Sequence, residues 1–418
     1  MSHRDEHSKL AWSVVAILFL GSVVNYMDRS VLGVVMPQIR HDLGLSHTGY
    51  GLAVNSFLTM YAIFYILGGR VADRLGYRRT FVVTVLFWSI ANMLHAAARG
   101  LASLCLFRAL LGAGEGGYYP TAIRAASEWF PPRDRAKAIG VLLCGISVGT
   151  LITPPIVAWI TYYYGWRAAF LATGASGALL VPLWLGVHRR VLRWRGDGHR
   201  VASPDNPPSA AAAPDDEPTP GEVLRRRKYW CLLSARAMTD SAWYFYLFWM
   251  PGYFQEIRGF DLATVGRLLW IPYFFSDVGA LGGAWTSSAL IRRGWSLHRG
   301  RITVLIPSAV LCMLGGLSFF AGSPYVALGL VSAALLGHQS WSSNIHTVIT
   351  EITPQRHVAV LYGITGAAGT VLGAISQPAL GNLIDRLGYM PAFVYAGAAY
   401  GVAITLLAAA GRIEKIRR

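Results

Sequence analysis

Charged side chains occur inside otherwise apolar stretches of this 418-residue sequence, where ionisable groups are costly. Arg108 and Glu115 are seven residues apart, so a helix would project both from one face. Tyr26 and Arg29 are three apart and would share a helical face in the same way. At low dielectric constant an arginine can hold a carboxylate through two parallel hydrogen bonds, and a carboxyl group can be neutral or charged according to its neighbours. These residue types predict an anion receptor beside a proton carrier.

The stretches that hold these charges are long enough to cross a membrane. The chain is 54% hydrophobic and only 14% charged, and a helix of about 20 mostly apolar residues spans the hydrocarbon layer with its backbone satisfied internally. The sequence therefore predicts an all-α membrane protein with twelve transmembrane helices. We expect them near residues 11–36, 49–71, 80–97, 101–126, 137–159, 166–188, 229–254, 264–290, 302–321, 324–350, 358–382 and 389–410.

The distribution of basic residues predicts the orientation of these helices. Most of the 37 lysines and arginines lie in the two tails and in the loops after the even-numbered spans. Six lie in the opposite loops, namely Arg40, Arg99, Arg167, Arg258, Arg267 and Arg386. This asymmetry predicts a multi-pass protein of the cell inner (plasma) membrane with both termini in the cytoplasm. It also explains the net charge of +16 without a nucleic-acid partner.

One segment of contrasting composition divides the chain. Residues 196–220 are rich in proline, alanine and acids and have no apolar periodicity, which is typical of a disordered linker. We expect an N-terminal six-helix bundle over residues 1–188 and a partly disordered cytoplasmic linker over residues 189–228. A C-terminal six-helix bundle should then cover residues 229–418.

The two expected bundles are related by an internal repeat. A shift of 223 residues pairs Gly114 with Gly337, Glu128 with Glu351, Pro131 with Pro354, Arg133 with Arg356, Gly140 with Gly363, Pro155 with Pro378, Gly165 with Gly388, Phe170 with Phe393 and Gly174 with Gly397. Nearer the start of each half, a shift of 214 pairs Pro37 with Pro251, Gly68 and Gly69 with Gly282 and Gly283, and Arg78 and Arg79 with Arg292 and Arg293. Two parallel six-helix repeats are the layout of many secondary transporters, which bind substrate between the halves near the midplane.

A spaced motif follows the second predicted span: Gly69, Asp73, Gly76, Arg78 and Arg79. It resembles the G-x-x-x-D-x-x-G-x-R-R signature of the major facilitator superfamily, in which this loop latches the cytoplasmic side. The resemblance implies a gating role for these five residues. The second-half copy has no acid between Gly282 and Leu290, so we expect an asymmetric latch. A solvated cytoplasmic turn is the alternative interpretation.

Other segments resemble the anion:cation symporter family within that superfamily, especially its hexuronate and sugar-acid branch. They are Asn25–Arg29, Phe107–Arg108, Gly114–Gly140 and Gly337–Asn344. The resemblance implies a monomeric, proton-coupled symporter that imports a small organic anion by alternating access, without a cofactor and without enzymatic activity. Its partners would be the anion, protons and the lipid bilayer.

The same resemblance implies roles for residues of the first half. Arg29 is expected to receive the substrate carboxylate, with Tyr26 and Tyr61 beside it. Asp28 and Glu115 are expected to couple transport to protons.

Arg108 is expected to exchange its interactions between Glu115 and the substrate. A static network of ion pairs that only packs the first half is an alternative for all these charges, because buried pairs can serve specificity alone.

Residues of the second half are expected to complete the site. His338 is related to Glu115 by the 223-residue shift and could bond a substrate hydroxyl, whereas a hydrogen-bonded packing histidine is the alternative. Trp341 could stack on the apolar face of a sugar ring. Gln339 and Asn344 are weaker candidates for substrate binding. Asp240 is expected to cap the seventh span.

The substrate and the direction of transport stay open at this point. Near Ile146 and Gly366, carriers of the aldonate branch offer amides that this chain lacks, so hexuronate is as plausible as aldonate. A proton-coupled exporter of drugs or metabolites on the same fold is one alternative, and a transport-like sensor is a remote one. No catalytic motif appears, and the four cysteines lack the spacing of a metal site or a disulfide framework.

Overall fold

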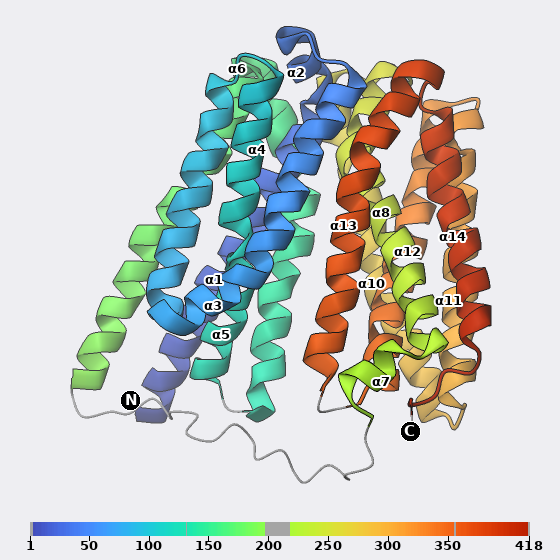
Figure 1. Ribbon diagram of the computed structural model, residues 1–418. Coiled ribbons are helices and arrows are strands. Elements are labelled where there is room, and N and C mark those ends of the chain that lie inside the picture. The colour runs from blue at the N-terminus through green and yellow to red at the C-terminus, as the bar shows by residue number, and fades with distance from the viewer. Residues whose placement is uncertain (1–2, 131, 197–217, 355–356, 417–418) are drawn as a thin grey trace. The chain divides into compact units, whose positions relative to one another are not determined.

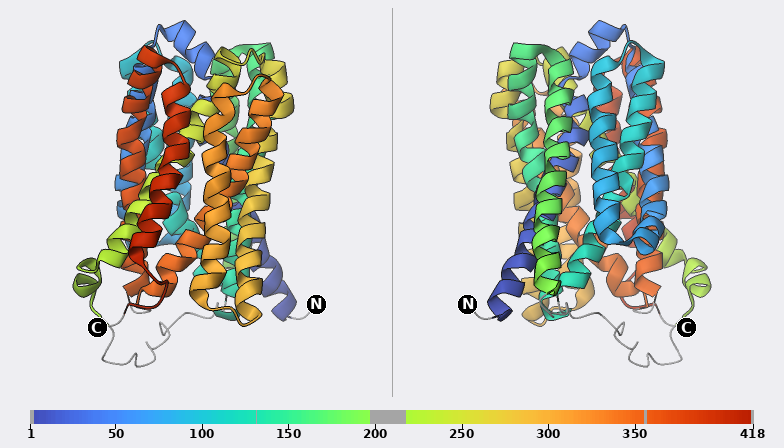
Figure 2. Two further views of the ribbon diagram at one scale, coloured as in Figure 1. Left: turned by 90° about the vertical axis from the view of Figure 1, so that its right-hand side faces the viewer. Right: turned by 90° about the vertical axis from the view of Figure 1, so that its left-hand side faces the viewer.

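The computed structural model describes residues 3–130, 132–196, 218–354 and 357–416, and these residues form helices without any strand (Figures 1 and 2). The all-α fold predicted from the sequence is confirmed. Contacts between residues divide the chain into two units. The first contains residues 1–45, 52–207 and 261–267, and the second contains residues 46–51, 208–260 and 268–418.

The first unit is built around long helices that run side by side (Figure 2). Its elements are α1 (His3–Val34), α2 (Met36–Leu43), α3 (His47–Leu94, beyond its first turn), the 3₁₀ turn η1 (His95–Ala97), α4 (Leu101–Gly116), α5 (Tyr118–Trp129) and α6 (Pro132–Gly196). Helix α9 (Leu262–Leu268) also belongs largely to this unit. Both α3 and α6 join two helices through a single non-helical glycine, Gly76 (φ 74°) and Gly165 (φ 80°) respectively. Glycine tolerates this conformation without a steric penalty.

The second unit repeats the arrangement. Its elements are α7 (Pro220–Leu224), α8 (Arg227–Glu256), α10 (Trp270–Arg292), α11 (Leu297–Gly315), the 3₁₀ turn η2 (Gly316–Phe320), α12 (Pro324–Ile352), α13 (Val358–Leu387) and α14 (Met390–Ala410). The short helix α7 opens with a capping box between Thr219 and Glu222. Most of the predicted linker lies outside the described residues.

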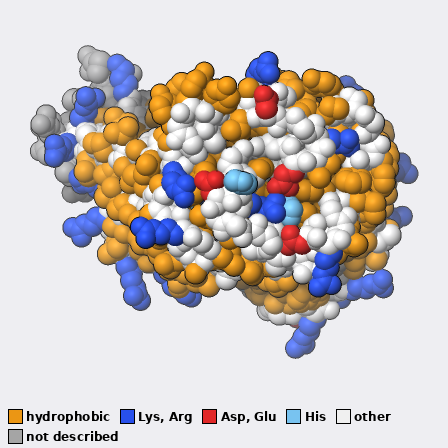
Figure 3. Space-filling model, turned by 90° about the horizontal axis from the view of Figure 1, so that it is seen from above, with side chains coloured by type: hydrophobic (Ala, Val, Ile, Leu, Met, Phe, Trp, Pro, Cys, Tyr) orange, Lys and Arg blue, Asp and Glu red, His pale blue; other side chains and the backbone are white. Residues whose placement is uncertain are grey.

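The helices suit a lipid environment. Among the described residues, seven helices are long and apolar enough to cross a membrane, one of them the 54-residue stretch Lys137–Arg190 that bends at Gly165. Helices occupy each of the twelve predicted ranges, although the count of twelve spans and the cytoplasmic termini stay predictions. Large apolar side chains remain open on the helix flanks, such as Leu281 (76% exposed) and Trp285 (68% exposed). Seen from above, much of the rim is likewise hydrophobic (Figure 3). Such surfaces are unfavourable in water and favourable in hydrocarbon.

One expectation about the seventh span is wrong. Asp240 does not cap the helix, because α8 begins at Arg227, three turns earlier. Pro251 lies inside α8, which continues to Glu256.

Candidate functional site

An ion pair between α1 and α4 lies at the centre of the first unit. The Arg29 Nη2 and Nε atoms donate to the same carboxylate oxygen of Glu115, over 2.9 and 3.2 Å. The Arg29 side chain is 4% exposed and that of Glu115 is not exposed at all. The other oxygen of Glu115 is buried and accepts no hydrogen bond from the described residues. A carboxyl group with one unused buried oxygen can bind a proton there, and protonation would weaken its hold on Arg29.

Aromatic rings surround the guanidinium group of Arg29. Its carbon lies 4.7 Å from the centroid of the Tyr26 ring, 4.5 Å from that of Tyr61 and 5.3 Å from that of Phe57. Rings at these distances stabilise a cation through their π faces and leave its N–H groups available for an anion. The structure therefore brings Tyr26, Arg29, Tyr61 and Glu115 together. Phe57 was missed because an apolar residue carries no sign of such a role in the sequence.

Close contact between α3 and α4 holds Tyr61 in place. A Cβ atom on Gly116 would lie 2.8 Å from the Tyr61 carbonyl oxygen, and one on Gly112 would lie 3.0 Å from the Tyr61 nitrogen. The backbones can approach this closely only because glycine has no side chain. The distance of the Tyr61 ring from Arg29 thus depends on two glycines of α4.

Replacing Gly116 with alanine is expected to disturb both stability and substrate binding. The added methyl would press on backbone atoms of α3, which cannot rotate away, so we expect a loss of about 1–3 kcal/mol in stability. The measurement is thermal unfolding together with substrate binding. The matched control is Gly140→Ala in α6, where no atom lies within 4 Å of the added Cβ. Equal behaviour of the two variants would contradict the proposed packing constraint.

Asp28 lies in a separate polar cluster of the first unit. Its Oδ1 atom accepts a hydrogen bond of 2.7 Å from the Asn92 amide, which also donates to Thr173 Oγ1 over 2.8 Å. Asp28 is wholly buried, and its second oxygen accepts no hydrogen bond from the described residues. Asn92 and Thr173 were missed by the sequence interpretation, although an amide within a predicted span was a usable signal. The cluster gives Asp28 an environment different from that of Glu115.

Arg108 is a buried arginine of the first unit that interacts with two acids. It is fully buried, and its guanidinium carbon lies 4.4 Å from the centroid of the Phe57 ring, on which Arg29 also packs. Arg108 interacts electrostatically with both Asp28 and Glu115. The hydrogen-bonded partner of Glu115, however, is Arg29.

The predicted residues of the second unit are mostly buried within it. His338 is stacked on Trp243, with 5.0 Å between ring centroids, and its Nδ1 atom is hydrogen-bonded to the Tyr400 hydroxyl. Trp341 is fully buried, and its indole donates to Thr239 Oγ1 over 3.2 Å. These contacts agree with the packing alternative for His338. Substrate contact by either residue stays a prediction.

The two amide candidates on α12 differ from each other. Gln339 is partly exposed, whereas Asn344 is fully buried. Asn344 accepts a hydrogen bond of 3.2 Å from Arg301 and donates one of 2.9 Å to the Ser340 carbonyl. Asn344 thus ties α11 to α12, and its proposed role in substrate binding stays untested.

A second ion pair within a helix was not predicted from the sequence. Arg236 and Asp240 lie one turn apart on α8, with 3.4 Å between Nε and Oδ2. The guanidinium group also contacts Thr365 and lies 4.6 Å from the centroid of the Tyr362 ring. A Cβ atom on Gly366 would lie 3.3 Å from Arg236 Nη2. The arginine therefore occupies the space beside Gly366, a position where this chain lacks an amide side chain.

The gating motif is described only in part. Gly76 forms the turn between the two halves of α3, and the Arg78 carbonyl accepts a hydrogen bond of 3.1 Å from the Trp184 indole. The surroundings of Gly69 and the side chain of Asp73 lie outside what the structure describes, and Arg79 is exposed. The gating role of all five residues stays a prediction.

The second-half copy of the motif is held differently. Ser287 stands where the 214-residue shift would place the aspartate, and it accepts a hydrogen bond of 2.8 Å from Arg301 Nη1. Arg301 also forms a two-bond ion pair with Glu351, over 2.6 and 3.2 Å. The acid that binds this arginine thus comes from α12.

Comparisons with known proteins agree with this architecture. The sequence pattern described as Major Facilitator Superfamily matches residues 18–377. The hexuronate transporter of Bacillus subtilis (strain 168) is 31% identical over 408 residues, covering 93% of this chain and 92% of that protein. The D-galactonate transporter of Escherichia coli O6:H1 is 28% identical over 401 residues, covering 92% of this chain and 91% of that protein.

A solved structure shows the same fold. The crystal structure of a bacterial homolog to the human lysosomal transporter Spinster, inward-facing and unoccupied, has a TM-score of 0.73 and 19% identity. The likeness covers 96% of this chain and 95% of that one. The superfamily predicted from the sequence is confirmed by these findings. The chain therefore belongs to the Major Facilitator Superfamily, as a multi-pass membrane transporter rather than an enzyme.

Proposed function

We propose that this chain is a proton-coupled symporter that imports a sugar acid across the inner (plasma) membrane by alternating access. The observation that carries the proposal is the buried Arg29–Glu115 pair inside its aromatic enclosure. Transporters named for hexuronate and D-galactonate, both sugar acids, support this class of substrate. The chain would act as a monomer in the bilayer.

The pair supports a simple coupling scheme. With Glu115 ionised, the Arg29 N–H groups are engaged by the protein's own carboxylate. When Glu115 takes up a proton, Arg29 becomes available to the carboxylate of the substrate, which binds with the same charge and the same donors. Loss of the proton on the inner side would restore the internal pair and expel the anion. Binding of anion and proton would thus be linked.

Asp28 and Arg108 have supporting roles in this scheme. The unused oxygen of Asp28 offers a second position for a proton. Arg108 is placed to compensate whichever acid is ionised, which lowers the cost of a buried charge. Tyr26 and Tyr61 would flank the bound carboxylate.

Uptake into proteoliposomes under an imposed pH gradient tests the proposal. The panel should contain uronates, aldonates, simple monocarboxylates and lipophilic cations. We expect accumulation of a uronate or aldonate only when the outside is more acidic, with competition by other sugar acids. Proton-driven movement of lipophilic cations, without any effect of sugar acids, would instead favour the exporter alternative.

A further inference from the structure

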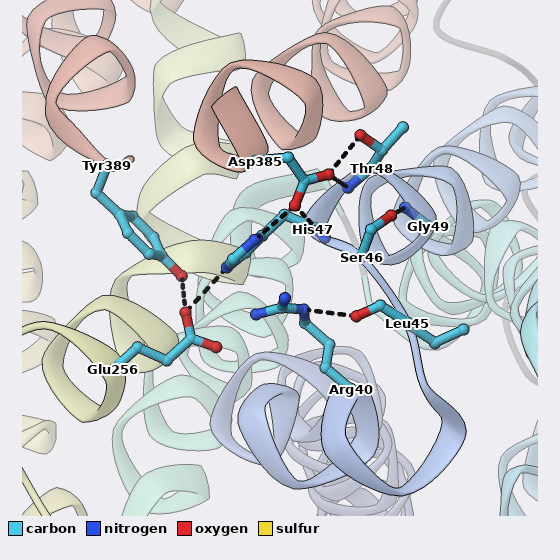
Figure 4. A network of polar contacts seen from close by, with 9 residues as sticks. All are labelled: Arg40, Leu45, Ser46, His47, Thr48, Gly49, Glu256, Asp385 and Tyr389. Carbon is cyan, nitrogen blue, oxygen red and sulfur yellow. Dashed lines mark hydrogen bonds and ion pairs between the residues drawn. The ribbon is translucent and has the colours of Figure 1, made fainter. Parts of the chain in front are cut away.

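The first turn of α3 is fastened by a carboxylate of α13. Asp385 Oδ2 accepts hydrogen bonds from the Thr48 backbone nitrogen (2.8 Å) and hydroxyl (2.7 Å), and Oδ1 accepts one of 2.8 Å from the His47 backbone nitrogen (Figure 4). The first N–H groups of a helix have no partner within it, and a negative charge there is favourable. Asp385 therefore binds the beginning of α3 as an anion.

The imidazole ring of His47 joins two carboxylates (Figure 4). Its Nδ1 atom lies 2.8 Å from Asp385 Oδ1 and its Nε2 atom lies 2.9 Å from Glu256 Oε2. Both oxygens already accept other donors, because Oε2 of Glu256 also takes the Tyr389 hydroxyl over 3.0 Å. Two acceptors facing both ring nitrogens require two N–H donors, and only the charged imidazolium has them. The two acceptors therefore match the two N–H donors of an imidazolium ring at His47.

The first turn of α3 packs closely against other residues of the second unit. The His47 ring lies 6.2 Å from that of Trp249, and the Tyr50 hydroxyl donates to the Phe248 carbonyl over 2.8 Å. A Cβ atom on Gly51 would lie 3.0 Å from the Cα atom of Pro378. Residues 46–51 consequently belong to the second unit, although the same helix continues from residue 52 into the first.

Comparison of the two repeats separates the features of this helix start that both share from those found in one. Under the 214-residue shift Asp261 corresponds to His47, and residues 261–267 belong to the first unit, so both repeats exchange the start of a helix. Gly266 there lies near Pro155, the repeat partner of Pro378. The Asp261 carboxylate accepts a hydrogen bond of 2.8 Å from the Thr264 backbone nitrogen, within its own helix start. Tyr162 takes the place that Asp385 has in the other half. The exchange is common to both repeats, whereas the contact of a histidine with two carboxylates is found at His47.

The hydrogen bond that holds Glu256 also has a counterpart in the first half. Glu256 corresponds to Asp42 under the 214-residue shift, and Tyr389 corresponds to Trp166 under the 223-residue shift. Asp42 accepts a hydrogen bond of 2.8 Å from the Trp166 indole, which lowers the pKa of the Asp42 carboxyl group. The hydrogen bond from Tyr389 to Glu256 therefore has a counterpart in the other half, the bond from Trp166 to Asp42. The contact of Glu256 with His47 is additional to this shared feature.

We propose that His47, Asp385 and Glu256 form a pH-sensitive clasp that holds the first turn of α3 while His47 is protonated and releases it when His47 loses its proton. The proposal rests on the alternating access of the proposed function, because any rocking of one half against the other must free or bend α3 at this turn. In the proposed orientation the clasp lies at the outer end. Protons outside would then favour its closure.

The direction of the pH effect follows from the groups that face His47. Histidine normally changes charge between pH 5 and 8. Deprotonation would leave one ring nitrogen as a lone pair facing a carboxylate oxygen, so closure should weaken as the pH rises. The groups that face the ring include Trp249 and Tyr389, together with the carboxylates of Asp385 and Glu256. Arg40, also drawn in Figure 4, donates a hydrogen bond of 3.2 Å to the Leu45 carbonyl.

Hydrogen exchange of the intact protein, followed by mass spectrometry, tests the clasp. The quantity compared is the protection of the amides of residues 46–51 at pH 5.5 and 8.0, corrected for the intrinsic pH dependence of exchange. For the unsubstituted protein we expect protection to fall about tenfold, the effect of roughly one partly screened, charge-assisted hydrogen bond. Residues 261–267 serve as an internal control, in which no histidine-dependent change is expected.

Two substitutions make the test specific. His47→Arg keeps a permanent charge and should stay protected at both pH values, whereas His47→Gln should be poorly protected at both. A flat profile in the unsubstituted protein, or an unchanged pH dependence in His47→Gln, would overturn the clasp. Because exchange is measured without substrate or gradient, that outcome leaves the proposed uptake activity untouched. A failure of uptake would conversely leave the exchange result standing.

Discussion

A Glu115→Gln substitution is expected to abolish proton-driven accumulation of the substrate and to spare its exchange. Glutamine matches glutamate in shape but cannot gain or lose a proton, so Arg29 would stay available to the substrate at every pH. One coupled proton supports about tenfold accumulation per pH unit of gradient. The variant should therefore equilibrate its substrate without concentrating it. The measurement is uptake with a gradient of one pH unit, compared with counterflow into vesicles preloaded with substrate.

The matched control for this substitution is Glu222→Gln. Glu222 belongs to the capping box of α7 in the second unit, and its loss should leave accumulation intact. Accumulation by the Glu115→Gln protein at the level of this control would mean that another group carries the proton. Asp28 would then be the acid to substitute next.

Arg29→Lys is expected to weaken substrate binding by about thirtyfold, or about 2 kcal/mol. Lysine keeps the positive charge but lacks the planar fork that presents two N–H groups to one carboxylate. It also fits less well between the rings of Tyr26 and Tyr61, which pack on the flat guanidinium group. Isothermal titration of the purified protein with the transported sugar acid measures the effect.

A surface arginine provides the comparison for Arg29. Arg167 also packs on an aromatic ring, that of Trp166, and also pairs with an acid, Asp42. Its side chain is 46% exposed, so Arg167→Lys should change affinity very little. If both lysine variants bind as tightly as the unsubstituted protein, Arg29 is not the receptor of the carboxylate.

Local spacing was enough to predict much of the fold and the core of the candidate site. Apolar runs predicted the helices because each span must satisfy its own backbone in lipid. The three-residue spacing of Tyr26 and Arg29 correctly placed them together. Arg29 and Glu115 could be recognised as candidates because burying an ionisable group within an apolar span costs free energy.

Features that depend on distant partners could not be predicted in the same way. The Asn92 and Thr173 contacts of Asp28 bring together three segments far apart in the chain. The clasp of His47 joins residues more than two hundred positions apart. No period or spacing in the sequence reports such pairs, because they follow from how helices pack.

The position of Asp240 within α8 shows another cause of error. The sequence interpretation placed Asp240 at a helix end because an acid near an apolar run often caps it. The structure places it in mid-helix, where its partner is Arg236 one turn earlier. Two opposite charges at this spacing were the signal of a paired site within the helix.

Net proton uptake on substrate binding is the most direct test of the exchange between Glu115 and the substrate on Arg29. It can be obtained by titrating the transported sugar acid into the purified protein in buffers that differ in ionisation enthalpy. The proposed exchange predicts that protons are taken up with the anion, that affinity rises as the pH falls, and that Glu115→Gln removes both effects. Binding without proton uptake and with the same affinity at every pH would identify the buried charges as a static network and contradict the proposed mechanism.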